Sequence, residues 1–229
     1  MQDSYVSETH LRQDPENIWL GRASRLRLPA ETLRDQALAV SGLLNGKIGG
    51  PSVKPYQPEG LWKEIASQAY DQGTGEDLYR RGMYTFWKRT VPPPTMVTFD
   101  ASSREICVLS RSRTNTPLQA LALLNEVSYV EAARNLAQQM MLTEKSPAAR
   151  LRWGWRQVTS REPSDYEVSV LANSLQRNLK RYAADSDAAK ELVSFGESIP
   201  AADLDVSELA AYTAVASMLM NLDEVINRE

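Results

Sequence analysis

Six residues between positions 81 and 116 have the side chains and the setting of an anion-binding site. They are Arg81, Arg104, Arg111, Arg113, Asn115 and Thr116. Pro117 suits the first turn of a helix, and the free backbone N–H groups at a helix start attract anions. Arginine adds a two-pronged donor for carboxylate, phosphate or sulfate. A structural interpretation is favoured over this one. In it, the polar side chains cap the helix, and Asp100 or Asp35 pairs with the arginines.

The charge of the chain is unevenly distributed. The formal net charge is −3, but residues 80–113 carry seven bases and two acids, whereas residues 185–229 carry ten acids and two bases. Aromatic side chains alternate with bases over residues 79–89, a mixture that could stack on bases or sugars. Burial of the aromatic rings with the basic groups reaching solvent is the favoured alternative. With a pI of about 5.4, the chain is not expected to bind nucleic acid.

A single cysteine and a single histidine exclude several kinds of site. Cys107 has no partner for an internal disulfide, and together with His10 it cannot form a four-ligand Cys/His zinc site. We expect Cys107 to be a small buried side chain, because it stands between Ile106 and Val108. The acidic clusters lack the glycine and the ligand spacing of a calcium loop. The sequence therefore predicts no metal site, and it assigns no catalytic residue.

The spacing of apolar residues predicts a mainly α fold, an irregular helical bundle with a loop-rich segment that could include a short β-hairpin. We expect residues 1–21 to form a flexible arm and residues 22–229 to form a single domain. Within this domain, residues 46–116 are the loop-rich part and residues 117–229 the helical part. No apolar run reaches the roughly 18 residues that a membrane span needs, and residues 1–25 lack the layout of a signal peptide.

Proline and capping residues predict where the helices start. One helix should run from Pro29 to Asn45-Gly46. Another should start at Pro117, with a buried stripe of Leu118, Leu121, Ala122 and Leu124. After an interruption near residues 125–128 it should continue to about residue 141. Further starts are predicted at Ser146-Pro147 and at a Ser164–Glu167 capping box. The most apolar segment follows Ser207, and we expect it to be the central helix.

Three blocks of sequence resemble a known family. They are RLPAETLRDQALAVSGLLNGKIGGPSVKP, then RRGMYTFWKRTVPPPTMVTFDA, then Cys107 followed by RTNTPLQALALLNE. In this order they resemble the C-terminal portion of the planctomycete cytochrome-c-associated domain of unknown function, the PSD domain family, over about residues 22–140. The resemblance implies a large exported protein, and hence a periplasmic or otherwise extracytoplasmic location. It also implies a neighbouring cytochrome-c-like module that carries haem c. This chain lacks the Cys-x-x-Cys-His needed to attach haem, so no cofactor is expected in it.

These observations lead to three functional hypotheses. The first is a non-catalytic interaction or docking module, whose partner is the upstream part of the same polypeptide or a cytochrome-c-like module. The second is an enzyme domain or binding domain for an anionic or carbohydrate ligand, which would use the arginine-rich region 80–116. The third is redox support, in which the domain docks a cytochrome module. A deep pocket with converging arginines would favour the second hypothesis, and a flat apolar patch would favour the first.

Overall fold

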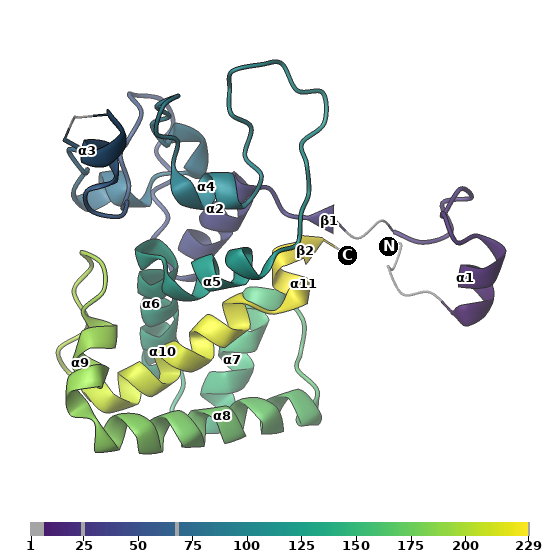
Figure 1. Ribbon diagram of the computed structural model, residues 1–229. Helices are drawn as coiled ribbons and strands as arrows, with labels where there is room; N and C mark the ends of the chain where they lie inside the picture. The colour runs from purple at the N-terminus through teal and green to yellow at the C-terminus, as the bar shows by residue number, and fades with distance from the viewer. Residues whose placement is uncertain (1–6, 24–25, 67–68, 229) are drawn as a thin grey trace.

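Two long helices form the centre of the molecule. The computed structural model describes residues 7–23, 26–66 and 69–228 (Figure 1). Helices α6 (Val127–Thr143) and α10 (Val206–Met220) pack against each other. Along α10 the side chains of Leu209, Ala210, Ala211, Tyr212, Val215, Ala216 and Leu219 are at most 1% exposed. A helix that is apolar on all sides belongs inside a protein, so the predicted central helix is confirmed.

The helices that follow α6 in sequence surround α10. They are α7 (Pro147–Thr159), α8 (Asp165–Ala184), α9 (Ser186–Val193) and α11 (Asp223–Ile226). The predicted caps are confirmed at two of these helices. The Ser146 hydroxyl accepts a hydrogen bond from the N–H of Ala149, and Ser164 and Glu167 form the reciprocal capping box before α8.

The first half of the chain contributes α2 (Ala30–Val40) and α5 (Pro117–Asn125) to the surroundings of α6. It also contains α1 (Glu8–Gln13), α3 (Leu61–Ala66), the 3-10 turns η1 (Gly75–Tyr79) and η2 (Gly82–Tyr84), and α4 (Pro94–Thr98). Helix α2 lies against α6, and α5 lies between α4 and α6. Figure 1 shows α1 apart from the helical body. The mainly α prediction is confirmed, whereas the arm and domain boundaries stay predictions.

Two short strands pair near the ends of the chain. Strands β1 (Leu26–Arg27) and β2 (Asn227–Arg228) are antiparallel, with Leu26 opposite Arg228. A hairpin within residues 46–116 was an option in the sequence. In the described part of this segment, the structure has isolated bridges instead, such as Val53 with Thr85. The pairing is therefore long-range, and local alternation of side chains could not reveal it.

Helix α2 ends earlier than predicted. Its last residue is Val40, and Gly42 has a φ of +71°. The N–H groups of Leu43 and Leu44 turn back to the Leu38 carbonyl at 2.9 and 3.0 Å. A left-handed glycine with such a returning hydrogen bond ends a helix. The prediction that the helix continues to Asn45-Gly46 is wrong, because Gly42 comes first.

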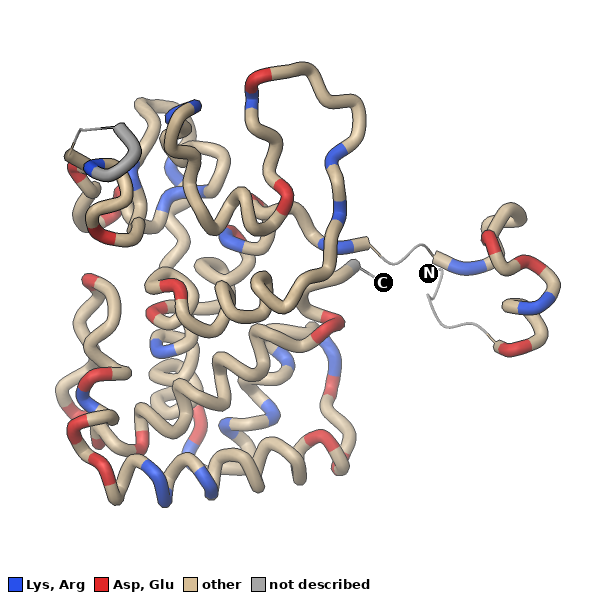
Figure 2. The backbone as a smooth tube through the Cα atoms, in the orientation of Figure 1, with Lys and Arg blue, Asp and Glu red and all other residues tan. Residues whose placement is uncertain are grey.

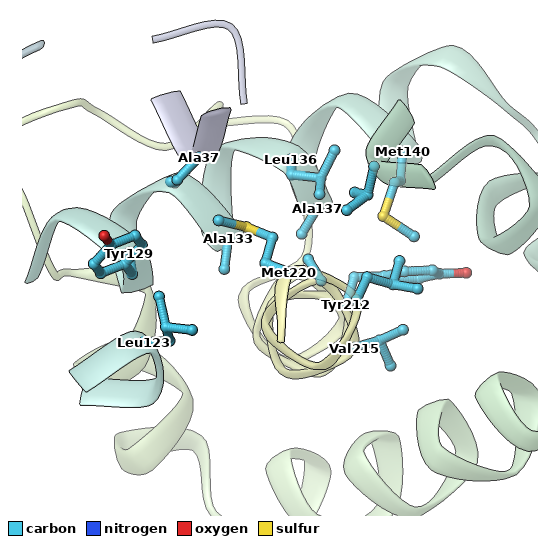
Figure 3. Close-up of a cluster of buried hydrophobic side chains, with 14 of the residues drawn as sticks. Ala37, Leu123, Tyr129, Ala133, Leu136, Ala137, Met140, Tyr212, Val215 and Met220 are labelled. Atoms are coloured by element: carbon cyan, nitrogen blue, oxygen red, sulfur yellow. The ribbon is translucent and has the colours of Figure 1, made fainter. Parts of the chain in front are cut away.

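The apolar core lies where α2, α5 and α6 meet α10. Figure 3 shows Leu136, Ala137 and Met140 of α6 in one cluster with Tyr212 and Val215 of α10. The three α6 side chains have no exposed surface. This core holds the first half of the chain and the last long helix in one unit.

A charged cluster is buried beside this core. Glu131 and Arg134 of α6 have no exposed side-chain surface, and Arg134 Nη2 lies 3.7 Å from Glu131 Oε1. The same Glu131 oxygen accepts hydrogen bonds from Tyr79 Oη at 2.8 Å and from the Ser198 N–H at 2.7 Å. Burial lowers the pKa of Arg134, an effect that the charge of Glu131 opposes. Gly196, with a φ of +85°, packs so closely on the Glu131 carboxyl that a methyl group there would overlap it.

The basic and acidic segments find ion-pair partners elsewhere in the fold. Figure 2 shows Lys and Arg along the loop before α5 and Asp and Glu near α9. Four ion pairs join the two segments to other parts of the chain: Arg81–Asp35, Arg111–Glu31, Arg150–Glu208 and Arg161–Glu224. Arg89–Glu105 and Lys190–Asp187 form within a segment. Each segment is thus balanced in part by other regions. Among the helices that the structure describes, none is long and apolar enough to cross a membrane.

Candidate functional site

Two of the four arginines in the predicted six-residue site are held by carboxylates of α2. Arg81 Nε lies 3.3 Å from Asp35 Oδ2, and Arg111 Nη1 donates to Glu31 Oε2 at 2.7 Å. Burial raises the pKa of Glu31, but the hydrogen bond and charge of Arg111, with the charge of Arg104, lower it overall. Both arginines therefore tether the loop-rich part to α2. Asp35 is one of the two partners that the structural interpretation names, whereas Glu31 is not.

The other two arginines of the predicted site, Arg104 and Arg113, belong to the loop before α5. The Arg104 guanidinium lies over the Trp87 ring, 5.0 Å from its centroid. Arg113 is exposed and, with Arg27 and Arg111, lines a cavity of about 190 Å³ that Asp100 also lines. The structure thus brings two of the predicted arginines to one cavity, together with Arg27, which sequence reasoning missed. Arg81 does not line this cavity.

The two polar residues of the predicted site take part in local structure. Thr116 is the N-cap of α5, and its N–H bonds to Gln119 Oε1 at 3.4 Å in a capping box. Asn115 Oδ1 accepts a hydrogen bond from Arg27 Nη2. The neighbouring Thr114 donates from its N–H and its hydroxyl to Asp100 Oδ2, at 2.7 and 2.9 Å. These contacts support the structural interpretation, and the ligand site of six residues stays a prediction.

The aromatic-basic stretch braces a loop. Arg80 is buried, its guanidinium lies 3.9 Å from the centroid of the Tyr84 ring, and it donates to the carbonyls of Lys47, Gly49 and Pro51. The expectation that every basic group of this stretch reaches solvent is wrong for Arg80. The reason is that the loop 47–51 folds over it and offers three carbonyls, which accept hydrogen bonds from Nη1 and Nη2 of the buried guanidinium.

The loop that carries Cys107 is exposed. The Cys107 side chain reaches solvent, and Ile106 and Leu109 are also exposed. The prediction of a buried Cys107 is wrong, because the apolar neighbours on which it relied are not covered themselves. Figure 1 shows this loop extending away from the helices.

Helix α5 presents three of its four leucines to solvent. Leu118, Leu121 and Leu124, here called the leucine face, are 62%, 56% and 48% exposed. The buried residues of α5 are Gln119 and Leu123. The predicted buried stripe is therefore wrong. Gln119 turns inward because its amide donates to the Thr98 carbonyl and to Thr114 Oγ1, both at 3.0 Å. A glutamine three residues after the capping threonine was the one available signal.

Sequence reasoning also missed a cavity at the junction of α5 and α6. Its volume is about 200 Å³, and residues of α2, of 55–58, of 93–96 and of 125–129 line it. Arg34 and Glu126 are its ionisable side chains of opposite charge. Arg34 Nη1 donates to Ser128 Oγ at 3.0 Å, across 94 residues of sequence. The sequence predicts an interruption near residues 125–128, where α6 starts, but no motif links these positions to Arg34.

Comparison with known proteins gives one family. A family model described as "PSD1: Protein of unknown function (DUF1553)" matches residues 1–175. No curated protein and no solved structure matches the chain.

Proposed function

The chain belongs to the PSD1 family of proteins of unknown function (DUF1553), and we propose that it is a non-catalytic docking module of a large exported multidomain protein. The leucine face of α5 carries this proposal. Three leucines on successive turns of one helix leave an apolar stripe in water, and exposed apolar stripes of this kind are typical of protein-protein contacts.

The sequence resemblance supplies the partner. It implies exported proteins in which this domain accompanies a cytochrome-c-like module, so the proposed occupant of the leucine face is the upstream part of the same polypeptide. Haem c would then be bound on the neighbouring module, and the location would be periplasmic or otherwise extracytoplasmic. The third hypothesis, redox support, corresponds to the case in which the cytochrome-c-like module is the part that contacts α5.

The substitution Leu121→Asp should disrupt docking and leave the fold intact. A charge at the centre of an apolar contact is expected to cost about 2–4 kcal/mol of binding, which weakens association at least tenfold. Because Leu121 is 56% exposed, the free energy of unfolding should change by no more than about 0.5 kcal/mol. Sedimentation velocity of this chain mixed with the separately expressed upstream part measures the association, and urea denaturation measures stability.

A matched control for this experiment is Met83→Asp, which places the same charge at another exposed apolar side chain, outside α5. It should leave association unchanged. Wild-type chain that forms no complex at micromolar concentrations would contradict the docking proposal. Equal binding by wild-type protein and Leu121→Asp would remove the leucine face from it.

The cavity lined by Arg27, Arg111 and Arg113 favours a second candidate function, which is the binding of an anionic or carbohydrate ligand. Two of these arginines belong to the region 80–116 that the sequence singled out. Arginine side chains at the wall of a cavity are suited to hold an anion.

Titration of sulfate by calorimetry tests this second candidate. Arg113→Ala should weaken sulfate binding at least fivefold, because it removes one charge-assisted contact worth about 1–3 kcal/mol. Arg152→Ala removes an exposed arginine from α7, far along the chain, and serves as the control. Equal sulfate affinity in wild-type protein and both variants would exclude the arginine cavity as an anion site.

A further inference from the structure

Arg34 is a buried cation at the wall of the cavity between α2 and the α5–α6 junction. It is 7% exposed. Its Nη1 donates to Ser128 Oγ, its Nη2 donates to the Leu78 carbonyl, and its Nε is buried with no hydrogen-bond acceptor among the described residues. A buried charge with a free donor is costly unless a partner of opposite charge is near. Arg34 is therefore suited to hold a carboxylate.

Glu126 supplies the opposite charge in the same cavity. Its Oε1 accepts a hydrogen bond at 3.1 Å from the same Ser128 hydroxyl that Arg34 contacts at 3.0 Å. A single hydroxyl thus links the Arg34 cation to the Glu126 carboxyl at the wall of the cavity. Burial raises the pKa of Glu126, and the charge of Arg34 opposes this effect. Removal of a carboxyl from water is offset when it gains a cationic partner.

The rest of the cavity wall is mostly apolar. Pro55, Pro58, Pro93, Pro94, Met96 and Tyr129 contribute to it. The volume of about 200 Å³ is below the roughly 300–1,000 Å³ of sites for drug-sized ligands. The site is therefore matched to a small molecule that has two opposite charges at one end and an apolar body at the other.

We propose that this cavity binds a free amino acid with an apolar side chain. The carboxylate contacts the Arg34 guanidinium, the ammonium group contacts the Glu126 carboxylate, and the side chain lies against the prolines and Tyr129. The site is separate from the leucine face and from the arginine cavity, so it does not depend on the function proposed above.

Calorimetric titration of the whole chain with L-leucine and L-phenylalanine tests this proposal. Each amino acid is compared with its deaminated and its decarboxylated analogue, which for leucine are 4-methylpentanoate and 3-methylbutylamine. At least one of the two amino acids should bind with a Kd below about 1 mM, in keeping with the affinity per atom of small ligands. Both of its analogues should bind at least tenfold more weakly, since each lacks one charge-assisted contact.

Two variants assign the binding to this cavity. Glu126→Gln should weaken amino-acid binding about tenfold and abolish the preference over the deaminated analogue, because only the ammonium contact is changed. Thr95→Trp places an indole at the cavity wall and should abolish binding. Arg81→Gln, an arginine outside the cavity, should have no effect. Circular dichroism confirms that each variant is folded. Arg34→Gln is informative only if it folds, so the test does not rely on it.

Three results would overturn the proposal. The first is that neither amino acid binds with a Kd below about 10 mM. The second is that the deaminated analogue binds wild-type protein as tightly as the amino acid, which would show a site for carboxylates alone. The third is that Glu126→Gln and Thr95→Trp, both folded, bind as the wild type does.

Discussion

Replacement of Glu131 with alanine is expected to lower the free energy of unfolding by about 3–5 kcal/mol, the cost of breaking a buried ion pair from one side. The Arg134 side chain has no exposed surface, and its Nε and Nη1 are buried with no acceptor among the described residues. Loss of Glu131 would leave this cation with hydrogen bonds from Nη2 to the Ser198 carbonyl and hydroxyl. Urea denaturation followed by circular dichroism measures the effect.

The double variant Glu131→Leu/Arg134→Met is the control for that experiment. It removes both charges together, and replacement of a buried ion pair by apolar side chains is often neutral or stabilising. The double variant should therefore be more stable than Glu131→Ala, even though it has one more substitution. A Glu131→Ala variant within about 1 kcal/mol of the wild type would show that Arg134 does not need this carboxylate.

Replacement of Leu136 with alanine is expected to cost about 2–5 kcal/mol of unfolding free energy, the range for a leucine removed from a closed core. Leu136 has no exposed surface, and it belongs to the core cluster shown in Figure 3. The identical change at Leu121, which is 56% exposed on the leucine face, should alter stability by no more than about 0.5 kcal/mol. Chemical denaturation of the two variants measures both values.

The comparison of these two leucines also bears on docking. If α5 folded back on the core, Leu121→Ala would cost nearly as much as Leu136→Ala, and equal losses would contradict the exposed leucine face. With a small loss at Leu121, a weaker complex in Leu121→Asp can be attributed to the interface. Stability and association are then two independent readouts of one helix.

The sequence by itself determined the helix starts and the central helix. Ser146 and Ser164 accept hydrogen bonds from N–H groups three residues ahead, and Gln119 reaches back to the Thr116 N–H. The information that sets each start therefore lies within one turn of the chain. The segment after Ser207 is apolar on every side, and such a helix has no stable place at the surface. The mainly α class follows from these local patterns.

Only the tertiary structure decided which face of α5 is buried and which polar groups meet. The Gln119 face of α5 is buried because the side-chain amide of Gln119 donates to the Thr98 carbonyl, which lies outside the helix. Arg111 reaches Glu31 across 80 residues, and Arg34 reaches Ser128 across 94. Apolar periodicity describes one helix at a time, whereas burial depends on which other elements arrive beside it. For that physical reason the leucine face and the Arg34 cavity could be found only in the folded chain.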